Sequence, residues 1–203
     1  MLREDRPPAF WDARYDEGRT PWELDGPSPE LLRVLDDERI APGAALDLGC
    51  GSGGSSVGMA QRGFRVTGVD LSESALAKAR ARAEAAGVAI AFRQFDLLEG
   101  GDLRGPFDLV FDRGCYHHLR RIDREPYLAL LRAVTPPGAR MLLLAGNADE
   151  PMEPGPPSVA AAPLVTELEP LFRVLSLRSM RFASVDGPDG RPPLGWSLFL
   201  ERR

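Results

Sequence analysis

The chain is poor in residues that mark several protein classes. Only two of its 203 residues are cysteine, and Cys50 and Cys115 show neither C-x-x-C spacing nor neighbouring metal ligands. We therefore expect no disulfide scaffold and no metal site. Lysine occurs once, at Lys78, and the formal net charge is −5. Because nucleic-acid binding needs a surplus of basic residues on one face, we expect no nucleic-acid partner.

Long apolar segments are also absent. No apolar run approaches the length that spans a bilayer, and residues 1–6 carry charges where a secretory signal needs an apolar segment. We therefore expect no membrane partner and a cytoplasmic location. The length fits one domain, residues 1–203, which we divide into a lid segment (1–26) and a core (27–203).

Strand-like and helix-like stretches alternate from residue 44 to 145, which is typical of a parallel sheet with crossover helices. The predicted strands are 44–48, 65–69, 89–95, 107–112 and 140–145, and the predicted helices are 29–38, 54–62, 73–86 and 124–134. A short helix at 164–171 precedes two more strands, 173–183 and 194–201, joined by a turn at 186–190. Such a pair forms an antiparallel hairpin. We expect the acidic, proline-rich loop 149–157 to be either solvated or a wall of the substrate site.

A glycine-rich turn after the first predicted strand is the most informative feature. Residues 46–53 read LDLGCGSG, which places Gly49, Gly51 and Gly53 before a predicted helix. Glycines there let a ligand approach backbone N–H groups at the start of the helix. Asp70 closes the next strand about 20 residues further on, where a carboxylate can accept two hydrogen bonds from a ribose diol. The sequence therefore predicts an adenosine-type ligand.

The residue before this turn narrows the ligand class. Asp47 stands two residues before Gly49, and the Gly49-x-Gly51-x-Gly53 spacing departs from the G-x-G-x-x-G of dinucleotide folds. A bound pyrophosphate gains nothing from an acidic side chain at this position, whereas a ligand that carries an ammonium group is attracted to one. A nicotinamide-dependent oxidoreductase is thus disfavoured. Three alternatives to a methionine-type ligand site remain: such an oxidoreductase, a module that binds a cofactor without catalysis, and a tight turn that binds no ligand.

Further candidates lie at the ends of the third and fourth predicted strands. Asp96 can accept a hydrogen bond from an adenine amino group or simply cap a turn, and Leu71 and Leu97 adjoin the two acids of this rim. Asp112 and Arg113 either pair with each other or hold a charged end of the cofactor or substrate.

Two histidines follow closely. His117 and His118 carry imidazoles that titrate near neutrality, which suits removal of a proton from a thiol or a hydroxyl. We expect at most one of them to be a general base, and a helix cap or a partly buried position is the alternative for each.

Aromatic residues gather in the lid segment. Trp11, Tyr15 and Trp22 lie on a polar segment interrupted by prolines. They either fix this segment to the core or cover a cationic ligand such as a sulfonium, from which a closed lid also excludes water.

Taken in order, these motifs resemble the class I S-adenosylmethionine-dependent methyltransferases, and among them the thiopurine, thiol and tellurite methyltransferase group. The resemblance spans nearly the whole chain, from W-x-x-x-Y and TPW in the lid segment through the glycine motif and DRG at 112–114 to GPP at 155–157. It implies an α/β, Rossmann-like, mostly parallel seven-stranded sheet with helices on both faces and a C-terminal antiparallel hairpin. It also implies S-adenosyl-L-methionine as cofactor, with the glycine motif at the methionine moiety, Asp70 on the ribose and the lid aromatics over the cofactor.

The resemblance predicts methyl transfer to a small soft nucleophile, a thiol or a chalcogen compound. His117, His118 and Arg113 are the catalytic candidates, and the family's matching arginine faces cofactor or substrate. O- or N-methylation of a small secondary metabolite is the alternative, in which a histidine base matters more. We expect a small-molecule acceptor as partner and a monomer or homodimer.

Overall fold

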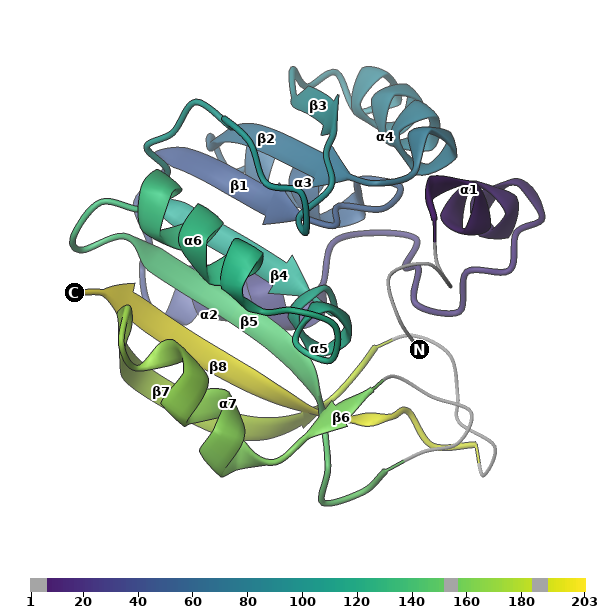
Figure 1. Ribbon diagram of the computed structural model, residues 1–203. Helices are drawn as coiled ribbons and strands as arrows, with labels where there is room; N and C mark the ends of the chain where they lie inside the picture. Colours follow the sequence, from purple (N-terminus) through teal and green to yellow (C-terminus); the bar gives the residue numbers. More distant parts are fainter. Residues whose placement is uncertain (1–6, 152–156, 184–189) are drawn as a thin grey trace.

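The computed structural model describes residues 7–151, 157–183 and 190–203 (Figure 1). The strands are β1 (Ala44–Leu48), β2 (Arg65–Asp70), β3 (Ala91–Gln94), β4 (Leu109–Arg113), β5 (Arg140–Asn147), β6 (Ser158–Val159), β7 (Phe172–Arg181) and β8 (Leu194–Arg202). The helices are α1 (Pro8–Asp16), α2 (Pro29–Asp37), α3 (Gly54–Ala60), α4 (Glu73–Ala85), α5 (Tyr116–Leu119), α6 (Glu125–Val134) and α7 (Ala161–Leu168).

The strands form one mixed sheet in the order β3-β2-β1-β4-β5-β8-β7, with the two-residue β6 pairing β5 beside this path. Strands β1 to β5 run parallel, and β8 is antiparallel to both β5 and β7. The chain order reverses between β1 and β4. In open α/β sheets, ligands bind beyond the carboxyl ends of the strands at this reversal.

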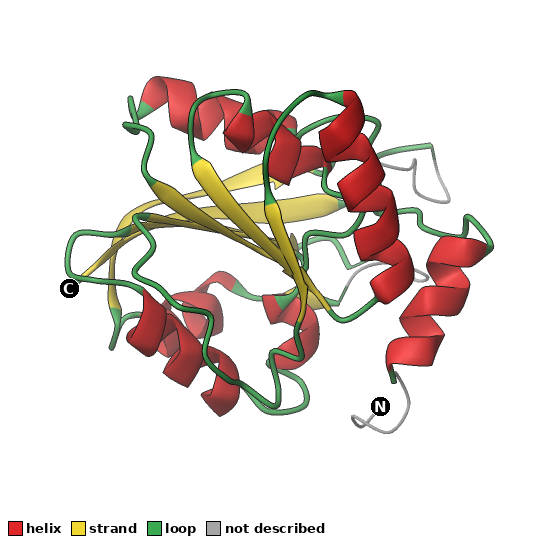
Figure 2. Ribbon diagram, turned by 90° about the horizontal axis from the view of Figure 1, so that it is seen from above, coloured by secondary structure: helices red, strands yellow, loops and turns green. Residues whose placement is uncertain are grey.

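Helices cover both faces of the sheet (Figure 2). Along β5, Leu143 packs with α6 and α7 on one face, whereas Leu142 and Leu144 pack with α2 and α3 on the other. Because successive strand residues face opposite sides, a strand buried on both faces is apolar throughout. This explains the continuous apolar run in β5.

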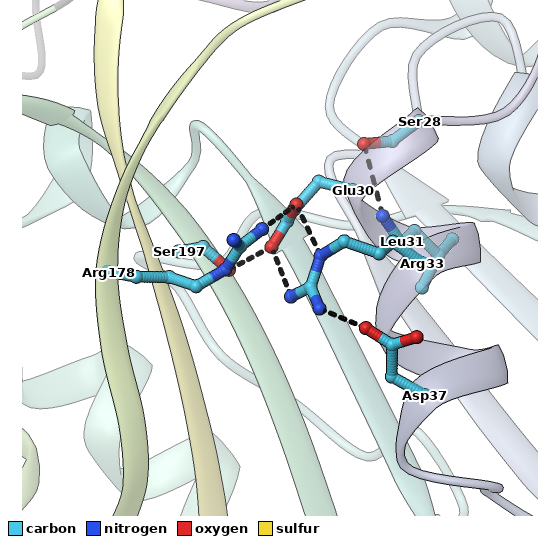
Figure 3. Close-up of polar contacts among 7 residues, drawn as sticks. All are labelled: Ser28, Glu30, Leu31, Arg33, Asp37, Arg178 and Ser197. Atoms are coloured by element: carbon cyan, nitrogen blue, oxygen red, sulfur yellow. Dashed lines mark hydrogen bonds and ion pairs between the residues drawn. The ribbon is translucent and has the colours of Figure 1, made fainter.

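Helix α2 is fastened to the hairpin of β7 and β8 by a partly exposed charge network (Figure 3). Glu30 accepts hydrogen bonds from Arg178 at 2.6 Å, from the Ser197 hydroxyl at 2.5 Å and from Arg33 at 3.0 Å. Burial alone would raise the pKa of Glu30, but the hydrogen bonds from Arg33 and Arg178 outweigh it and lower the pKa to about 2. The network joins segments 148 and 167 residues apart in the chain.

The predicted α/β fold is confirmed, and most element boundaries lie within a few residues of the prediction. The third strand is shorter than predicted, because its pairing with β2 begins only at Ala91. Helix α7 begins at Ala161, three residues before the predicted 164. Helices α1 and α5 and strand β6 were not among the predicted elements. Residues 152–156 of the loop and 184–189 of the hairpin turn lie outside the described residues. Among the described helices, none has the length and apolarity that crossing a bilayer requires.

Candidate active site

The glycine-rich turn joins β1 to α3 at the carboxyl edge of the sheet. Gly49, Gly51 and Gly53 have φ angles of 63°, 54° and 80°, which side chains rarely adopt. A Cβ at Gly49 would overlap the Cys115 sulfur, and one at Gly51 would overlap a carboxylate oxygen of Glu23. Both conformation and space therefore require glycine here, and the bare backbone of the turn lies directly against its neighbours.

Asp70 ends β2 beside this turn. Its carboxylate accepts hydrogen bonds from the Gly51 N–H at 2.8 Å and the Ser72 N–H at 2.9 Å. Burial raises the pKa of Asp70 from 3.8 to about 6; the two N–H groups oppose this, and the Glu23 carboxylate adds to it. Because a carboxylate has roughly four lone-pair sites, it can still accept from further donors such as a ribose diol.

Asp47 lies deeper than the turn. It is 2% exposed, and the Ser56 hydroxyl of α3 donates to it at 2.5 Å. Burial raises the pKa of Asp47 to about 7 against the effect of this hydrogen bond, and the charges of Asp70 and Asp112 raise it further. The carboxylate is therefore engaged between β1 and α3, and its contact with a ligand ammonium group stays a prediction.

The residues after β2 and β3 form the adjoining rim. The Leu71 carbonyl accepts from the Gln94 amide at 3.0 Å, and Leu97 packs into the core at 8% exposure. The Asp96 carboxylate accepts from the Leu98 N–H at 2.8 Å and so caps the turn after β3. A contact between Asp96 and adenine stays a prediction.

Asp112 and Arg113 do not form the ion pair that the sequence allowed, because neighbouring strand residues point to opposite faces. Asp112 is fully buried and accepts from the Tyr127 hydroxyl at 2.6 Å, the Cys115 N–H at 2.9 Å and the Tyr116 N–H at 3.1 Å. Burial raises its pKa to about 6, against the effect of the Tyr127 hydrogen bond. Its carboxylate is thus occupied in starting α5.

Arg113 faces the lid segment instead. Its guanidinium donates to the Trp22 carbonyl at 2.6 Å and lies 5.5 Å from the Phe182 ring centroid. Burial lowers the pKa of Arg113, while the charge of Glu23 opposes this. Within the described part of the chain no carboxylate lies within 4.0 Å of the guanidinium. This partly buried cation therefore has donors left for an anionic group.

The two histidines have different surroundings. The Nδ1 atom of His117 accepts from the Gly146 N–H at 2.9 Å, and the residue is 4% exposed. Burial lowers the pKa of His117 well below its usual value, so the ring is neutral with its proton on Nε2. No free lone pair then remains for a general base. His118 is partly exposed, and its ring meets that of Trp11 edge-on at 6.1 Å.

Helix α5, which carries both histidines, is also anchored from α7. Glu167 accepts from the Tyr116 hydroxyl at 2.5 Å and from Arg120 at 2.6 and 3.0 Å. Burial raises the pKa of Glu167, but the hydrogen bonds from Arg120 and Tyr116 outweigh it and lower the pKa overall. The sequence indicated no such role for Glu167.

The lid segment places its aromatic residues at this edge. The Trp11 and Trp22 rings meet edge-on at 5.7 Å, and the Trp22 indole donates to the Tyr15 hydroxyl at 3.1 Å. Tyr15 is buried, and α1 lies beside α4 (Figure 1). The three predicted lid aromatics are therefore close together, next to His118.

Sequence reasoning missed three polar residues that fasten this segment. Asp12 accepts from the Ser72 hydroxyl at 2.6 Å, Glu23 binds the glycine-rich turn, and Arg82 of α4 donates to the Asp25 carbonyl at 3.0 Å. These partners are 60, 29 and 57 residues apart in the chain. No local pattern signals contacts of this range.

Comparison with known proteins decides the family. The model of the thiopurine S-methyltransferase family matches residues 6–191. The chain belongs to this family. It is therefore a class I S-adenosylmethionine-dependent methyltransferase, and the predicted family and cofactor are confirmed.

Other known proteins are similar to this thiopurine S-methyltransferase family member, and the chain spans about three fifths of the length of the first curated relatives that it matches. An uncharacterized methyltransferase of Schizosaccharomyces pombe is 36% identical over 86 residues, which is 42% of this chain and 59% of that protein. A protein solved in work on the conversion of a disulfide bond into a thioacetal group during echinomycin biosynthesis matches with TM-score 0.80 at 24% identity, covering 95% of this chain and 90% of that one. The Burkholderia thailandensis 1,6-didemethyltoxoflavin-N1-methyltransferase, with S-adenosylhomocysteine bound, gives TM-score 0.74 at 22% identity, covering 97% and 87%.

The residues at this edge suit S-adenosylmethionine, which presents a ribose diol, an amino-acid end and a sulfonium. Asp70 has acceptor sites left for the diol, and Arg113 has donors left for a carboxylate. Gly51 carries no side chain, and Glu23 and Tyr15 of the lid segment lie directly against its backbone.

Proposed function

We propose that this methyltransferase transfers the methyl group of S-adenosylmethionine to a small soft nucleophile, a thiol or a chalcogen compound. The observation that carries the proposal is the partly buried Arg113, which has no carboxylate partner within 4.0 Å among the described residues. A cation in a desolvated site stabilises an anionic nucleophile such as a thiolate more than a neutral amine. The S-methyltransferase family supports the same acceptor class.

When bound, the cofactor supplies the electrophilic methyl group on its sulfonium. The task of the protein is then alignment and exclusion of water. In our proposal Asp70 and the turn at Gly51 hold the nucleoside, and Trp11 and Trp22 cover it. Arg113 faces the reacting end from the tip of β4.

The proposal gives the histidines unequal roles. His117 holds α5 against the end of β5 through Gly146, and His118 is the candidate general base. A thiol ionises close to neutral pH, so this base is helpful but dispensable for a thiol acceptor. The partly exposed His118 beside Trp11 also favours a second candidate, O- or N-methylation of a small secondary metabolite, for which a base matters more.

We further propose that the enzyme acts in the cytoplasm as a monomer or homodimer, on a small molecule rather than on nucleic acid or a membrane. The net charge of −5 supports this, because anionic phosphates repel an acidic protein.

Transfer of a labelled methyl group to a panel of thiols, hydrosulfide, selenite, tellurite, halides, phenols and amines tests the proposal. We expect label in thiols or chalcogen compounds and a large loss of rate in Arg113→Ala. Arg132→Ala, on the exposed side of α6, is the matched control and should behave as wild type. Label in phenols or amines alone would favour the second candidate. Tight cofactor binding without transfer to any acceptor would indicate a non-catalytic module.

A further inference from the structure

Glu23 joins the lid segment to the glycine-rich turn. Its Oε1 accepts from the Ser52 N–H at 3.4 Å and from the Tyr15 hydroxyl at 3.1 Å, and the Ser52 hydroxyl donates to Oε2. Arg82 in turn donates to the Ser52 hydroxyl oxygen at 3.2 Å. Ser52 is 6% exposed and Tyr15 is 4% exposed, whereas Glu23 is partly exposed, so these bonds are partly shielded from water. We call Glu23, Ser52 and Tyr15 the Glu23 latch.

The Glu23 latch lies against Gly51 of the glycine-rich turn. A Cβ at Gly51 would overlap both the Glu23 carboxylate and the Tyr15 hydroxyl, so lid and turn are in direct contact. Within the described residues no basic side chain lies within 4.0 Å of Glu23. Its charge is therefore stabilised at close range by the donors of Ser52 and Tyr15, and removing either partner leaves the other with an unsatisfied polar group.

We propose that Glu23 is a positioning residue that fastens the aromatic lid to the glycine-rich turn and so couples lid closure to retention of the cofactor. The inference rests on the proposed function, because it takes the lid to cover the bound cofactor. Glu23 directly follows Trp22 and bonds to Tyr15, so two of the three lid aromatics are held by the latch. A cofactor that leaves must displace the lid, and a broken latch therefore speeds its release.

Two measurements on Glu23→Ala test this. Hydrogen exchange of the backbone amides of residues 8–25, without any ligand, should become faster than in wild type. The release rate of S-adenosylhomocysteine, followed by tryptophan fluorescence, should rise about tenfold or more, the effect of losing a hydrogen bond to a charged group. Glu17→Ala is the matched control, since Glu17 is an exposed acid of the same segment whose carboxylate pairs with Arg19. It should leave both quantities as in wild type.

Further variants separate the latch from a general loss of folding. Glu23→Gln keeps an acceptor for Ser52 and should give a smaller increase in release. Ser52→Ala combined with Glu23→Ala should release the cofactor no faster than Glu23→Ala alone, because both act through one bond. Wild-type exchange and wild-type release in Glu23→Ala would overturn the latch. If wild type binds no S-adenosylhomocysteine, the proposed function fails, while the exchange measurement still decides whether Glu23 holds the lid.

Discussion

Affinity for the cofactor should fall steeply when the pH drops below 6. The ionised form of Asp70 accepts the two hydrogen bonds of a ribose diol much more strongly than the protonated form, and burial raises the pKa of Asp70 to about 6 in the ligand-free protein. About nine tenths of the carboxyl groups are then ionised at pH 7 and about one tenth at pH 5. The dissociation constant should therefore rise about tenfold between these two pH values.

The same shift gives the sign of the effect on stability. The folded-state pKa of Asp70 lies above its ordinary 3.8, so folding favours the protonated form. The contribution of Asp70 to stability is therefore present at low pH and is lost as the pH rises from 3.8 through about 6. A ligand that donates hydrogen bonds to the carboxylate offsets this loss. The ligand should accordingly raise the thermal midpoint more at pH 7 than at pH 5.

Calorimetric titration with S-adenosylhomocysteine from about pH 5 to about pH 8 measures the effect, a range that spans the pKa values involved. Asp70→Asn should bind more weakly and lose the pH dependence. Asp47→Asn is the necessary comparison, because the pKa of Asp47 is itself raised to about 7 by burial. If the slope persists in Asp70→Asn and disappears in Asp47→Asn, the reasoning is refuted and Asp47 is the titrating group.

Three further changes have defined outcomes. Glu30→Gln should lower the free energy of unfolding at neutral pH by about 1 to 2 kcal/mol, a value discounted for partial solvent exposure. The folded-state pKa of Glu30 is lowered from 4.5 to about 2. In urea denaturation, the difference in unfolding free energy between wild type and Glu30→Gln should therefore vanish as the pH falls from 4.5 to about 2. The exposed Glu73→Gln is the control. Gly49→Ala should lower the thermal midpoint and weaken cofactor binding, and Cys115→Ala should partly restore both, because the added methyl group overlaps the Cys115 sulfur. His117→Phe should destabilise the fold by about 1 to 3 kcal/mol in chemical denaturation through the unsatisfied Gly146 N–H; unchanged stability would contradict the neutral, bonded state of His117.

The parts of the fold that local chemistry controls could be predicted from the sequence. The predicted helices 29–38 and 73–86 begin directly after Ser28 and Ser72, whose hydroxyls cap α2 and α4 by accepting from N–H groups three residues on. The apolar runs of β1 and β5 mark strands that are buried on both faces. Helix α1 could not be predicted, because its nine residues carry no continuous apolar stripe and its place beside α4 depends on Asp12 bonding to Ser72.

Some residues of the candidate site could likewise be predicted from the sequence, whereas the contacts of others could not. The glycines and Asp70 could be found because a strand, a turn and the next strand place them within about 20 residues, the spacing of the motif. The sequence alone did not show which partner each side chain of the site would contact. Asp112 and Arg113 are neighbours in sequence, yet one is bonded to Tyr127 and the other to Trp22. His117 and His118 differ only in what surrounds them, and burial makes the first a neutral acceptor for Gly146.

Charge explains why this edge of the sheet suits a cationic ligand. The carboxylates of Glu23 and Asp70 raise the pKa of buried Asp47, and Glu23 raises that of Asp70, so these acids repel one another in the ligand-free protein. Arg113 has no carboxylate within 4.0 Å among the described residues and relieves only part of this repulsion. A sulfonium and an ammonium group would relieve more of it, whereas a pyrophosphate would add to it. In the proposed lid mechanism, Glu23 brings negative charge to the turn when the lid closes, and a cationic ligand would therefore favour the closed arrangement.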